Sequence, residues 1–291
     1  MLKAFVKLLS RLPLRVLYFL ADVCLYPLVY YVVRYRRRIV RKNLSASFPD
    51  YSPRQIRRIE RRFYRHFADV IAEIIKGYTI SDTEMQRRVT FRNVNLIEEL
   101  AQQYGGVFLM LGHYGNWEWM ADIAKRYTLP GLTLDSVYRR LKNESMDRLM
   151  YDIRLRRGTT LSEKRQILRT VIARRAAGQP TSYGMISDQK PSSKSTWCTI
   201  PFLHRQTAFL DGTETLARKF GYPIVYFHVE QPRRGYYDVT IRCISPSPKD
   251  EPLYEPTRRY ARWLEQDIIA APHLWLWTHN RWKAPAPTPN N

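Results

Sequence analysis

GVFLMLGHYGNWE, residues 106–118, is the stretch that decides the fold of this chain. An apolar run ends two positions before His113, and Glu118 follows His113 by five residues. On a single helix, five residues at about 100° each would leave the two side chains roughly 140° apart. The spacing instead fits a change of element: a buried strand, a tight loop over residues 112–116, and a helix that begins at Trp117.

This arrangement places His113 at the carboxyl end of a strand and Glu118 in the first helical turn. Ligands of open α/β sheets bind at that edge. A neutral His113 can accept a hydroxyl proton with one ring nitrogen while Glu118 holds the other N–H, and the N–H groups that open the helix can bind an oxyanion or a phosphate. The alternative is a structural histidine beside a helix-capping glutamate.

From about residue 89 onward, short apolar runs alternate with helical patterns, which is typical of an α/β fold. We expect strands at residues 107–111, 132–138, 181–187, 224–230 and 237–244, and helices at residues 117–127, 143–157, 163–177, 207–220 and 256–271. We expect the α/β part of the chain to form one domain that spans residues 43–283. Residues 284–291 are rich in Pro and Asn, which predicts a disordered tail.

The charge of the chain indicates an anionic partner. Its 291 residues carry 48 Lys and Arg against 26 Asp and Glu, a formal net charge of +22, and Arg outnumbers Lys by 36 to 12. Guanidinium groups bind phosphate with two hydrogen bonds, so nucleic acid, an anionic membrane surface and a phosphorylated substrate are all candidate partners. The three cysteines have no metal-type spacing, so we expect neither a disulfide framework nor a zinc site, and a reducing compartment fits.

Residues 12–33 are mostly apolar and long enough to span a bilayer. We expect residues 1–42 to form a hydrophobic membrane anchor with basic flanks. The heavier basic cluster follows the apolar stretch, so a single span would leave the body in the cytoplasm. Two internal charges and Pro27 slightly favour a helix lying in the inner leaflet. A cleaved signal peptide and a buried helix of a soluble protein are the less favoured alternatives.

Ser52-Pro53-Arg54-Gln55 is a capping box that opens an amphipathic helix. Apolar residues recur at helical spacing from Ile56 onward, and a stripe of arginines runs beside them. The plainer interpretation is a packed helix with a solvated face. The functional interpretation adds contact with anionic headgroups, at about 1 kcal/mol for each basic residue near such a surface.

The sequence from His113 to Glu118 resembles the signature of the bacterial lipid A biosynthesis acyltransferases, the late acyltransferases of lauroyl and myristoyl type. The resemblance covers most of the chain. It includes Arg37, Asn43, Leu44, Phe48 and Pro49 after the hydrophobic segment, Tyr138-Arg139, Arg154, Asp188-Gln189, and the closing segment from Trp277 to Lys283. Arg140 and the tripeptide Phe202-Leu203-His204 depart from the usual pattern, which bears on the acyl pocket and the acceptor.

The resemblance implies a central mixed sheet flanked by helices, like the sandwich of glycerol-phosphate acyltransferases, with a membrane-associated amino-terminal helix. It also implies a membrane-bound enzyme of the bacterial inner membrane, with its catalytic domain on the cytoplasmic face. Such an enzyme moves a fatty acyl chain from acyl carrier protein to a hydroxyl of a phosphorylated glycolipid, a lipid A precursor.

The resemblance implies His113 and Glu118 as the catalytic pair. It implies Asn116, Arg139, Arg154, Asp188 and Gln189 as substrate-binding residues. No metal or cofactor is required, because the base and the oxyanion donors can come from the protein.

Three alternatives stay open at this point. The acceptor can be another bacterial aminolipid or phosphoglycolipid. The chain can be a basic nucleic-acid-binding protein, although the hydrophobic anchor argues for anionic inner-membrane lipids and against nucleic acid. It can also be a membrane scaffold without catalytic activity.

Overall fold

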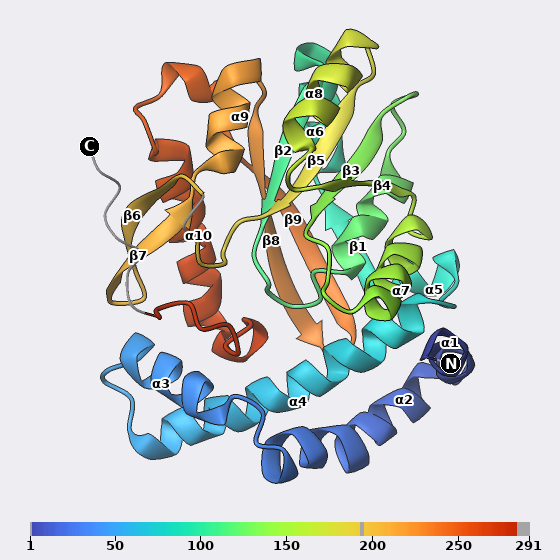
Figure 1. The fold of residues 1–291 in the computed structure, drawn as a ribbon, viewed down its shortest axis with the longest axis vertical. Helices are drawn as coiled ribbons and strands as arrows, with labels where there is room; N and C mark the ends of the chain where they lie inside the picture. Colours follow the sequence, from blue (N-terminus) through green and yellow to red (C-terminus); the bar gives the residue numbers. More distant parts are fainter. Residues whose placement is uncertain (1, 193–194, 284–291) are drawn as a thin grey trace.

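The structure, a computed structural model, describes residues 2–192 and 195–283. Its main sheet contains β1 (Val89–Arg92), β2 (Gly106–Leu111), β3 (Thr133–Tyr138), β4 (Thr159–Glu163), β5 (Thr181–Ile186), β8 (Ile224–Arg233) and β9 (Tyr236–Ser245). The strands lie in the order β1-β9-β8-β2-β5-β3-β4 (Figure 1). β8, β2, β5, β3 and β4 run parallel, whereas β9 pairs antiparallel with β8. The predicted mixed sheet is therefore confirmed.

The apolar run that opened the sequence argument is the central strand of this sheet. All six residues of β2 are buried, and β2 pairs in parallel with β5 on one side and β8 on the other. A parallel strand covered on both faces reads as a continuous apolar run because neither face meets water. Gly106 is needed here, since a Cβ at this position would lie 2.5 Å from the Tyr222 ring.

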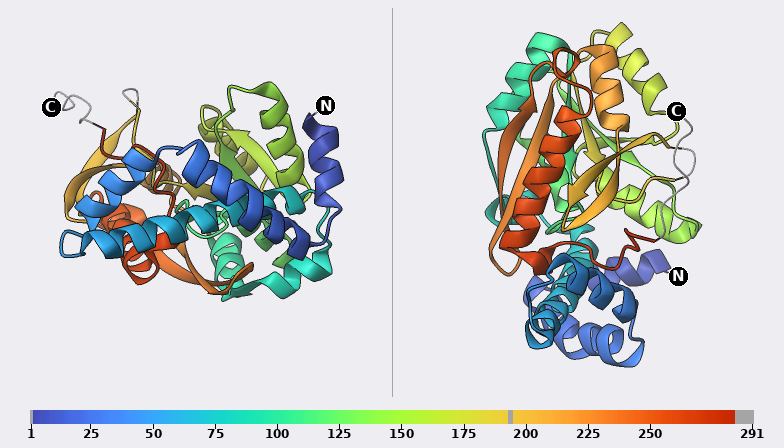
Figure 2. Two further views of the ribbon diagram at one scale, coloured as in Figure 1. Left: turned by 90° about the horizontal axis from the view of Figure 1, so that it is seen from below. Right: turned by 90° about the vertical axis from the view of Figure 1, so that its left-hand side faces the viewer.

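Helices cover both faces of the sheet and one of its ends (Figures 1 and 2). The α-helices are α1 (Leu2–Ser10), α2 (Leu14–Leu20), α3 (Arg37–Ser47), α4 (Pro53–Gly77), α5 (Asp82–Arg88), α6 (Val94–Tyr104), α7 (Glu144–Leu155), α8 (Ile167–Ala176), α9 (Gly212–Phe220) and α10 (Glu255–Ala270). The capping box at the start of α4 is confirmed, because Ser52 and Gln55 bond each other's backbone N–H groups.

Three of the predicted helices differ in the structure. The helix predicted at residues 163–177 begins only at Ile167, as α8, and the strand β4, which was not predicted, ends at Glu163. The predicted helix at residues 207–220 begins as the strand β7 (Arg205–Leu210), which forms an antiparallel hairpin with β6 (Trp197–Phe202). The helix after the His113 loop is a 3₁₀ helix, Trp119–Arg126. The predicted tail at residues 284–291 lies outside the described residues.

The amino-terminal helices form a layer against α4, at one end of the sheet (Figure 2). Leu14–Val32 is long and apolar enough to cross a membrane, with a mean hydropathy of 1.4. Only 22% of this segment is buried, but its inner side packs on the body. Tyr18 bonds Glu73 of α4, and Arg234, in the β8–β9 turn, forms an ion pair with Asp22 at 2.7 Å. The predicted boundary at residue 42 stays a prediction.

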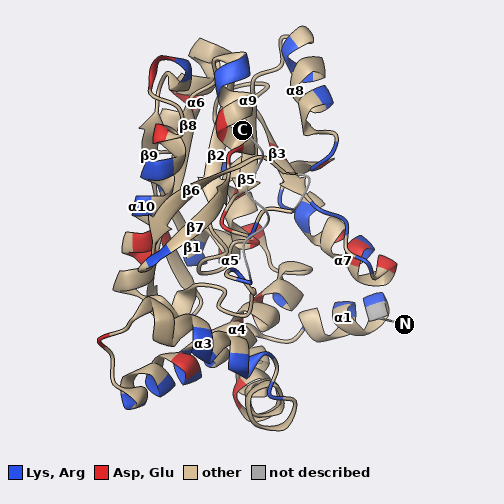
Figure 3. Ribbon diagram, turned by 60° about the vertical axis from the view of Figure 1, so that its left-hand side comes forward, with Lys and Arg blue, Asp and Glu red and all other residues tan. Residues whose placement is uncertain are grey.

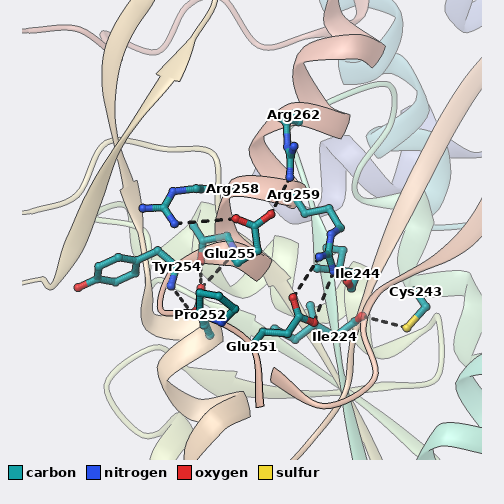
Figure 4. A network of polar contacts seen from close by, with 12 residues as sticks. Ile224, Cys243, Ile244, Glu251, Pro252, Tyr254, Glu255, Arg258, Arg259 and Arg262 are labelled. Atoms are coloured by element: carbon teal, nitrogen blue, oxygen red, sulfur yellow. Dashed lines mark hydrogen bonds and ion pairs between the residues drawn. The ribbon is translucent and has the colours of Figure 1, made fainter. Parts of the chain in front are cut away.

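At the far end of the sheet, ion pairs hold the start of α10 (Figure 4). Arg259 reaches Glu251 at 3.1 Å and also bonds the carbonyl of Ile244 in β9, while Arg262 reaches Glu255 at 2.7 Å. Partly exposed pairs of this kind contribute little to stability. The pairs instead help to position α10, which contacts the end of β2 and the loop after it. The Tyr260 hydroxyl donates to the Leu111 carbonyl, and the Tyr114 hydroxyl donates to the Asp267 carbonyl.

Candidate active site

His113 and Asp188 meet because two neighbouring strands end at the same edge. β2 and β5 are parallel, and Leu111 lies opposite Ile186 in their register. His113 follows the end of β2 by two residues, and Asp188 follows the end of β5 by two residues. The equal offsets bring the side chains together, with His113 Nδ1 at 2.6 Å from Asp188 Oδ1.

The carboxylate of Asp188 is buried and fully bonded. Its Oδ2 accepts the backbone N–H of His113 and the indole N–H of Trp275, both at 2.8 Å. Burial alone would raise the pKa of Asp188, but the charge of His113 and these hydrogen bonds lower that pKa to about 2. Asp188 is therefore ionised at neutral pH, which assigns the Nδ1 proton to His113.

The opposite ring nitrogen of His113 is left with its lone pair. The side-chain amide nitrogen of Gln189 lies 3.2 Å from Nε2, so the amide N–H donates to it. The imidazole is 17% exposed and stands edge-on to the Trp117 ring. An acceptor hydroxyl that replaces the Gln189 amide would find a hydrogen-bond acceptor held in place by Asp188.

The expected contact between Glu118 and His113 is corrected by the structure. Glu118 accepts two hydrogen bonds from the Arg154 guanidinium, at 2.8 and 2.7 Å. The reason is local: the loop turns before the helix begins at Trp119, which directs Glu118 toward α7, and Nδ1 of His113 already bonds Asp188. Any part that Glu118 plays in the reaction passes through Arg154 and stays a prediction.

Asn116, predicted to bind substrate, lies inside the protein instead. Its side chain is buried, its amide N–H donates to Glu73 at 2.7 Å, and its amide oxygen accepts the backbone N–H of Trp119 at 3.1 Å. With both ends of the amide bonded, Asn116 fixes the shape of the loop rather than presenting a surface to a ligand.

Glu73 of α4 is a residue that the sequence argument missed. Its buried carboxylate accepts hydrogen bonds from the hydroxyls of Tyr18 and Tyr237, at 2.7 and 2.8 Å, as well as from Asn116. Burial raises the pKa of Glu73 to about 7, against the opposing effect of these donors. In the sequence, Glu73 lies at the helical spacing of the apolar, buried residues of α4 rather than among its arginines, and this pattern could have identified it. Glu73 links the amino-terminal layer to the loop that carries His113.

A basic edge follows β3 and β4. Arg139 is exposed. The pKa of Lys164 is lowered, mainly because its ammonium group is partly buried and also because of the nearby charge of Arg139. The neighbouring Arg140 forms an ion pair with Glu163 at 2.7 Å. Arg154 lies over the Tyr138 ring at 6.0 Å, so the Arg139 edge and the Glu118–Arg154 pair adjoin. Lys164 was not predicted, because nothing in its local sequence separates it from other surface lysines.

The carboxyl-terminal segment closes the other side of the site. The backbone N–H of Gly115 donates to Leu274 and that of Leu276 donates to His113, both at 3.0 Å. Gly115 has a φ of +59°, and a Cβ there would lie 3.2 Å from Val229, so glycine suits this tight turn. The indole of Trp275 also bonds Asp188, so this segment holds both members of the pair.

A small apolar hollow lies beside His113, between α4 and the carboxyl-terminal segment. Its volume is about 10 Å³, and its walls include Phe67, Val70, Trp117 and Leu276. Within residues 2–192 and 195–283, no group of three or more His, Cys, Asp or Glu side chains is arranged to hold a metal ion.

The fold and the site define an α/β protein in which a histidine, held by a carboxylate, lies at the carboxyl edge of the sheet. The chain belongs to the bacterial lipid A biosynthesis acyltransferase family, which it matches over residues 1–284. It is 26% identical over 254 residues to the lipid A biosynthesis lauroyltransferase of Escherichia coli (strain K12), across 85% of this chain and 79% of that protein. The predicted family and the predicted class of enzyme, an acyltransferase, are confirmed. The family and the amino-terminal apolar helix are consistent with the bacterial inner membrane.

Proposed function

We propose that the enzyme transfers a fatty acyl chain from acyl carrier protein to a hydroxyl group of a phosphorylated lipid A precursor. The observation that carries this proposal is the 2.6 Å contact between His113 Nδ1 and Asp188, which leaves Nε2 as a proton acceptor. The reaction takes place at the inner membrane, with the catalytic domain on its cytoplasmic face.

The proposed reaction proceeds by proton transfer, attack on the thioester and release of the thiol. Nε2 of His113 takes the proton of the acceptor hydroxyl while the oxygen attacks the thioester carbonyl carbon. Asp188 stabilises the imidazolium that forms. When the tetrahedral intermediate collapses, the C–S bond breaks, and the imidazolium returns its proton to the departing thiolate. The amide N–H of Gln189, beside Nε2, is available for the oxyanion.

Two surfaces beside His113 fit the two substrates. Arg139, Lys164 and the Glu118–Arg154 pair offer cationic groups to the phosphates of the acceptor or the carrier. The apolar hollow at Trp117 lies where an acyl chain would approach. Because its volume is only about 10 Å³, Trp117 and Phe67 must separate to admit a chain.

The test is an assay of the purified full-length enzyme with acyl carrier protein and coenzyme A thioesters as donors and defined lipid A precursors as acceptors. For His113→Ala we expect a loss of roughly 10²–10⁴-fold in kcat/KM in protein that is still folded at the assay temperature, which thermal unfolding checks. Full activity of His113→Ala would contradict the mechanism and support a non-catalytic role for His113.

The acceptor is tested separately, by mass spectrometry of lipid A from a deletion strain. An unchanged number of acyl chains would point to another aminolipid or phosphoglycolipid as the acceptor.

A further inference from the structure

A second cavity lies away from His113, where the amino-terminal helices meet α4, α5 and the β8–β9 turn. Its volume is about 680 Å³. On α4, His66 contacts the carbonyl of Gly115 in the His113 loop, and Lys76, which lines the cavity, is ten residues further on. Ten residues of helix separate the two positions by about 15 Å. The reaction proposed for His113 does not use this cavity.

The walls of the cavity carry an excess of positive charge. The lining has four basic residues and one acidic residue, Glu84, and so a net charge of +3. The basic residues are Arg15, Lys76, Arg87 and Arg88. Glu84 forms its ion pair with Arg88, at 2.6 Å. Lys76 donates to the backbone carbonyls of Ser10 and Leu12, which are neutral groups.

Arg15 and Arg87 are the two groups free to hold a ligand. Both are exposed, and within residues 2–192 and 195–283 neither side chain makes a hydrogen bond or an ion pair. Two guanidinium groups that face one cavity without a carboxylate suit a phosphate, because each can donate two parallel hydrogen bonds to its oxygens.

The cavity adjoins the apolar outer side of α2. Val16, Phe19 and Val23 are 39%, 63% and 50% exposed, and their spacing places them on one side of the helical segment that begins beside Arg15. An apolar side next to arginine is the pattern of a helix that lies at the boundary between headgroups and acyl chains. Arg15 then stands at the depth of the headgroups.

We propose that this basic cavity binds the phosphate headgroup of an anionic phospholipid, with the acyl chains lying along α2. A net negative headgroup is favoured over a zwitterionic one because the lining has three uncompensated positive charges. The inference rests on the proposed membrane attachment but not on the proposed acyl transfer. Binding measurements therefore test it separately from activity.

The experiment uses the full-length protein in detergent and native mass spectrometry with added phosphatidylglycerol, phosphatidylcholine or inorganic phosphate. The variant is Arg15→Gln with Arg87→Gln. Its matched control is Arg169→Gln with Lys219→Gln, which removes two exposed charges from α8 and α9, at the end of the sheet opposite α4 (Figure 1). All four side chains are exposed, so we expect unchanged thermal unfolding in both.

We expect phosphatidylglycerol to bind the wild type and the control alike, and to bind the Arg15/Arg87 variant at least about tenfold more weakly. Phosphatidylcholine should bind the wild type less tightly than phosphatidylglycerol. Equal binding of phosphatidylglycerol to all three proteins would overturn the proposal. Inorganic phosphate that binds as tightly as phosphatidylglycerol would overturn the lipid as the source of the phosphate.

Discussion

At the scale of single residues, Asp188 sets the state of His113. It accepts both the Nδ1 proton and the backbone N–H of His113, so it fixes the ring and its tautomer together. Glu118 has a different partner, the Arg154 guanidinium, through two hydrogen bonds. The two carboxylates therefore hold different side chains, and their substitution should have separable effects.

We predict that Asp188→Asn lowers kcat/KM by roughly 10²–10⁴-fold, because an amide N–H facing Nδ1 favours the tautomer whose Nε2 carries a proton and cannot act as a base. Glu118→Gln should instead weaken the hold on Arg154 and act mainly on KM for the phosphorylated acceptor. Steady-state kinetics with both substrates varied checks this. If Glu118→Gln abolishes kcat while Asp188→Asn is mild, the assignment is reversed.

At the scale of elements, α4 carries the amino-terminal layer on one side and the His113 loop on the other. Glu73 receives Tyr18 from α2, Asn116 from the loop and Tyr237 from β9. Its backbone carbonyl also accepts the indole N–H of Trp119 at 3.2 Å. A single buried carboxylate thus joins four elements, and its ionisation bears on the stability of all of them.

The pH dependence of stability should reveal Glu73. Burial raises its pKa in the folded protein to about 7, from 4.5. Below pH 4.5 Glu73 is protonated in both the folded and the unfolded protein, so its ionisation does not change the free energy of unfolding. Between pH 4.5 and 7 the unfolded chain ionises first, so the folded state loses stability, by roughly 3 kcal/mol in all.

We predict that Glu73→Gln flattens this decline, measured by chemical denaturation in detergent between pH 5 and pH 8. Gln keeps the shape of Glu, and the Tyr18 hydroxyl can rotate to accept from its amide. Glu73→Ala is the contrasting variant, because it leaves buried donors unpaired and should destabilise the protein at every pH. The same slope in the wild type and in Glu73→Gln would show that another group titrates.

At the scale of the whole molecule, the amino-terminal segment has two different sides. Leu14, Leu17 and Ala21 belong to the same buried cluster as the central strand β2, whereas Val16, Phe19 and Val23 are exposed. Basic residues lie along the neighbouring α3 and α4 (Figure 3). The inner side of the segment serves the fold, and the outer side is free to meet a membrane.

Substitutions on the two sides should therefore separate membrane binding from stability. We predict that Val16→Ser, Phe19→Ser and Val23→Ser together shift the protein from the membrane to the soluble fraction without a large change in unfolding. The Leu17→Ala variant should behave in the opposite way. It should remain in the membrane fraction, and its free energy of unfolding should fall by about 2–5 kcal/mol. Cell fractionation and thermal unfolding measure the two effects. A triple variant that stays with the membrane would place the attachment elsewhere.

The elements missed by sequence reasoning are those that depend on distant partners. The β6–β7 hairpin turns through Leu203 and His204, whose φ values are +49° and +61°. Such turns usually carry Asn or Gly, so this turn had no recognisable signal. Leu203 is buried and its N–H donates to Glu265 of α10 at 2.5 Å, which shows that tertiary contacts stabilise the turn. β4 forms because β3 pairs with it.

The sequence by itself determined the buried central strand, the loop after it and the placement of His113 at the carboxyl edge of the sheet, because apolar runs, glycines and helix caps act over a few residues. Only the tertiary structure decided which carboxylate serves His113. Glu118 is five residues away along the chain, yet Asp188, 75 residues away, makes the contact. The reason is the parallel register of β2 and β5, which no local pattern encodes.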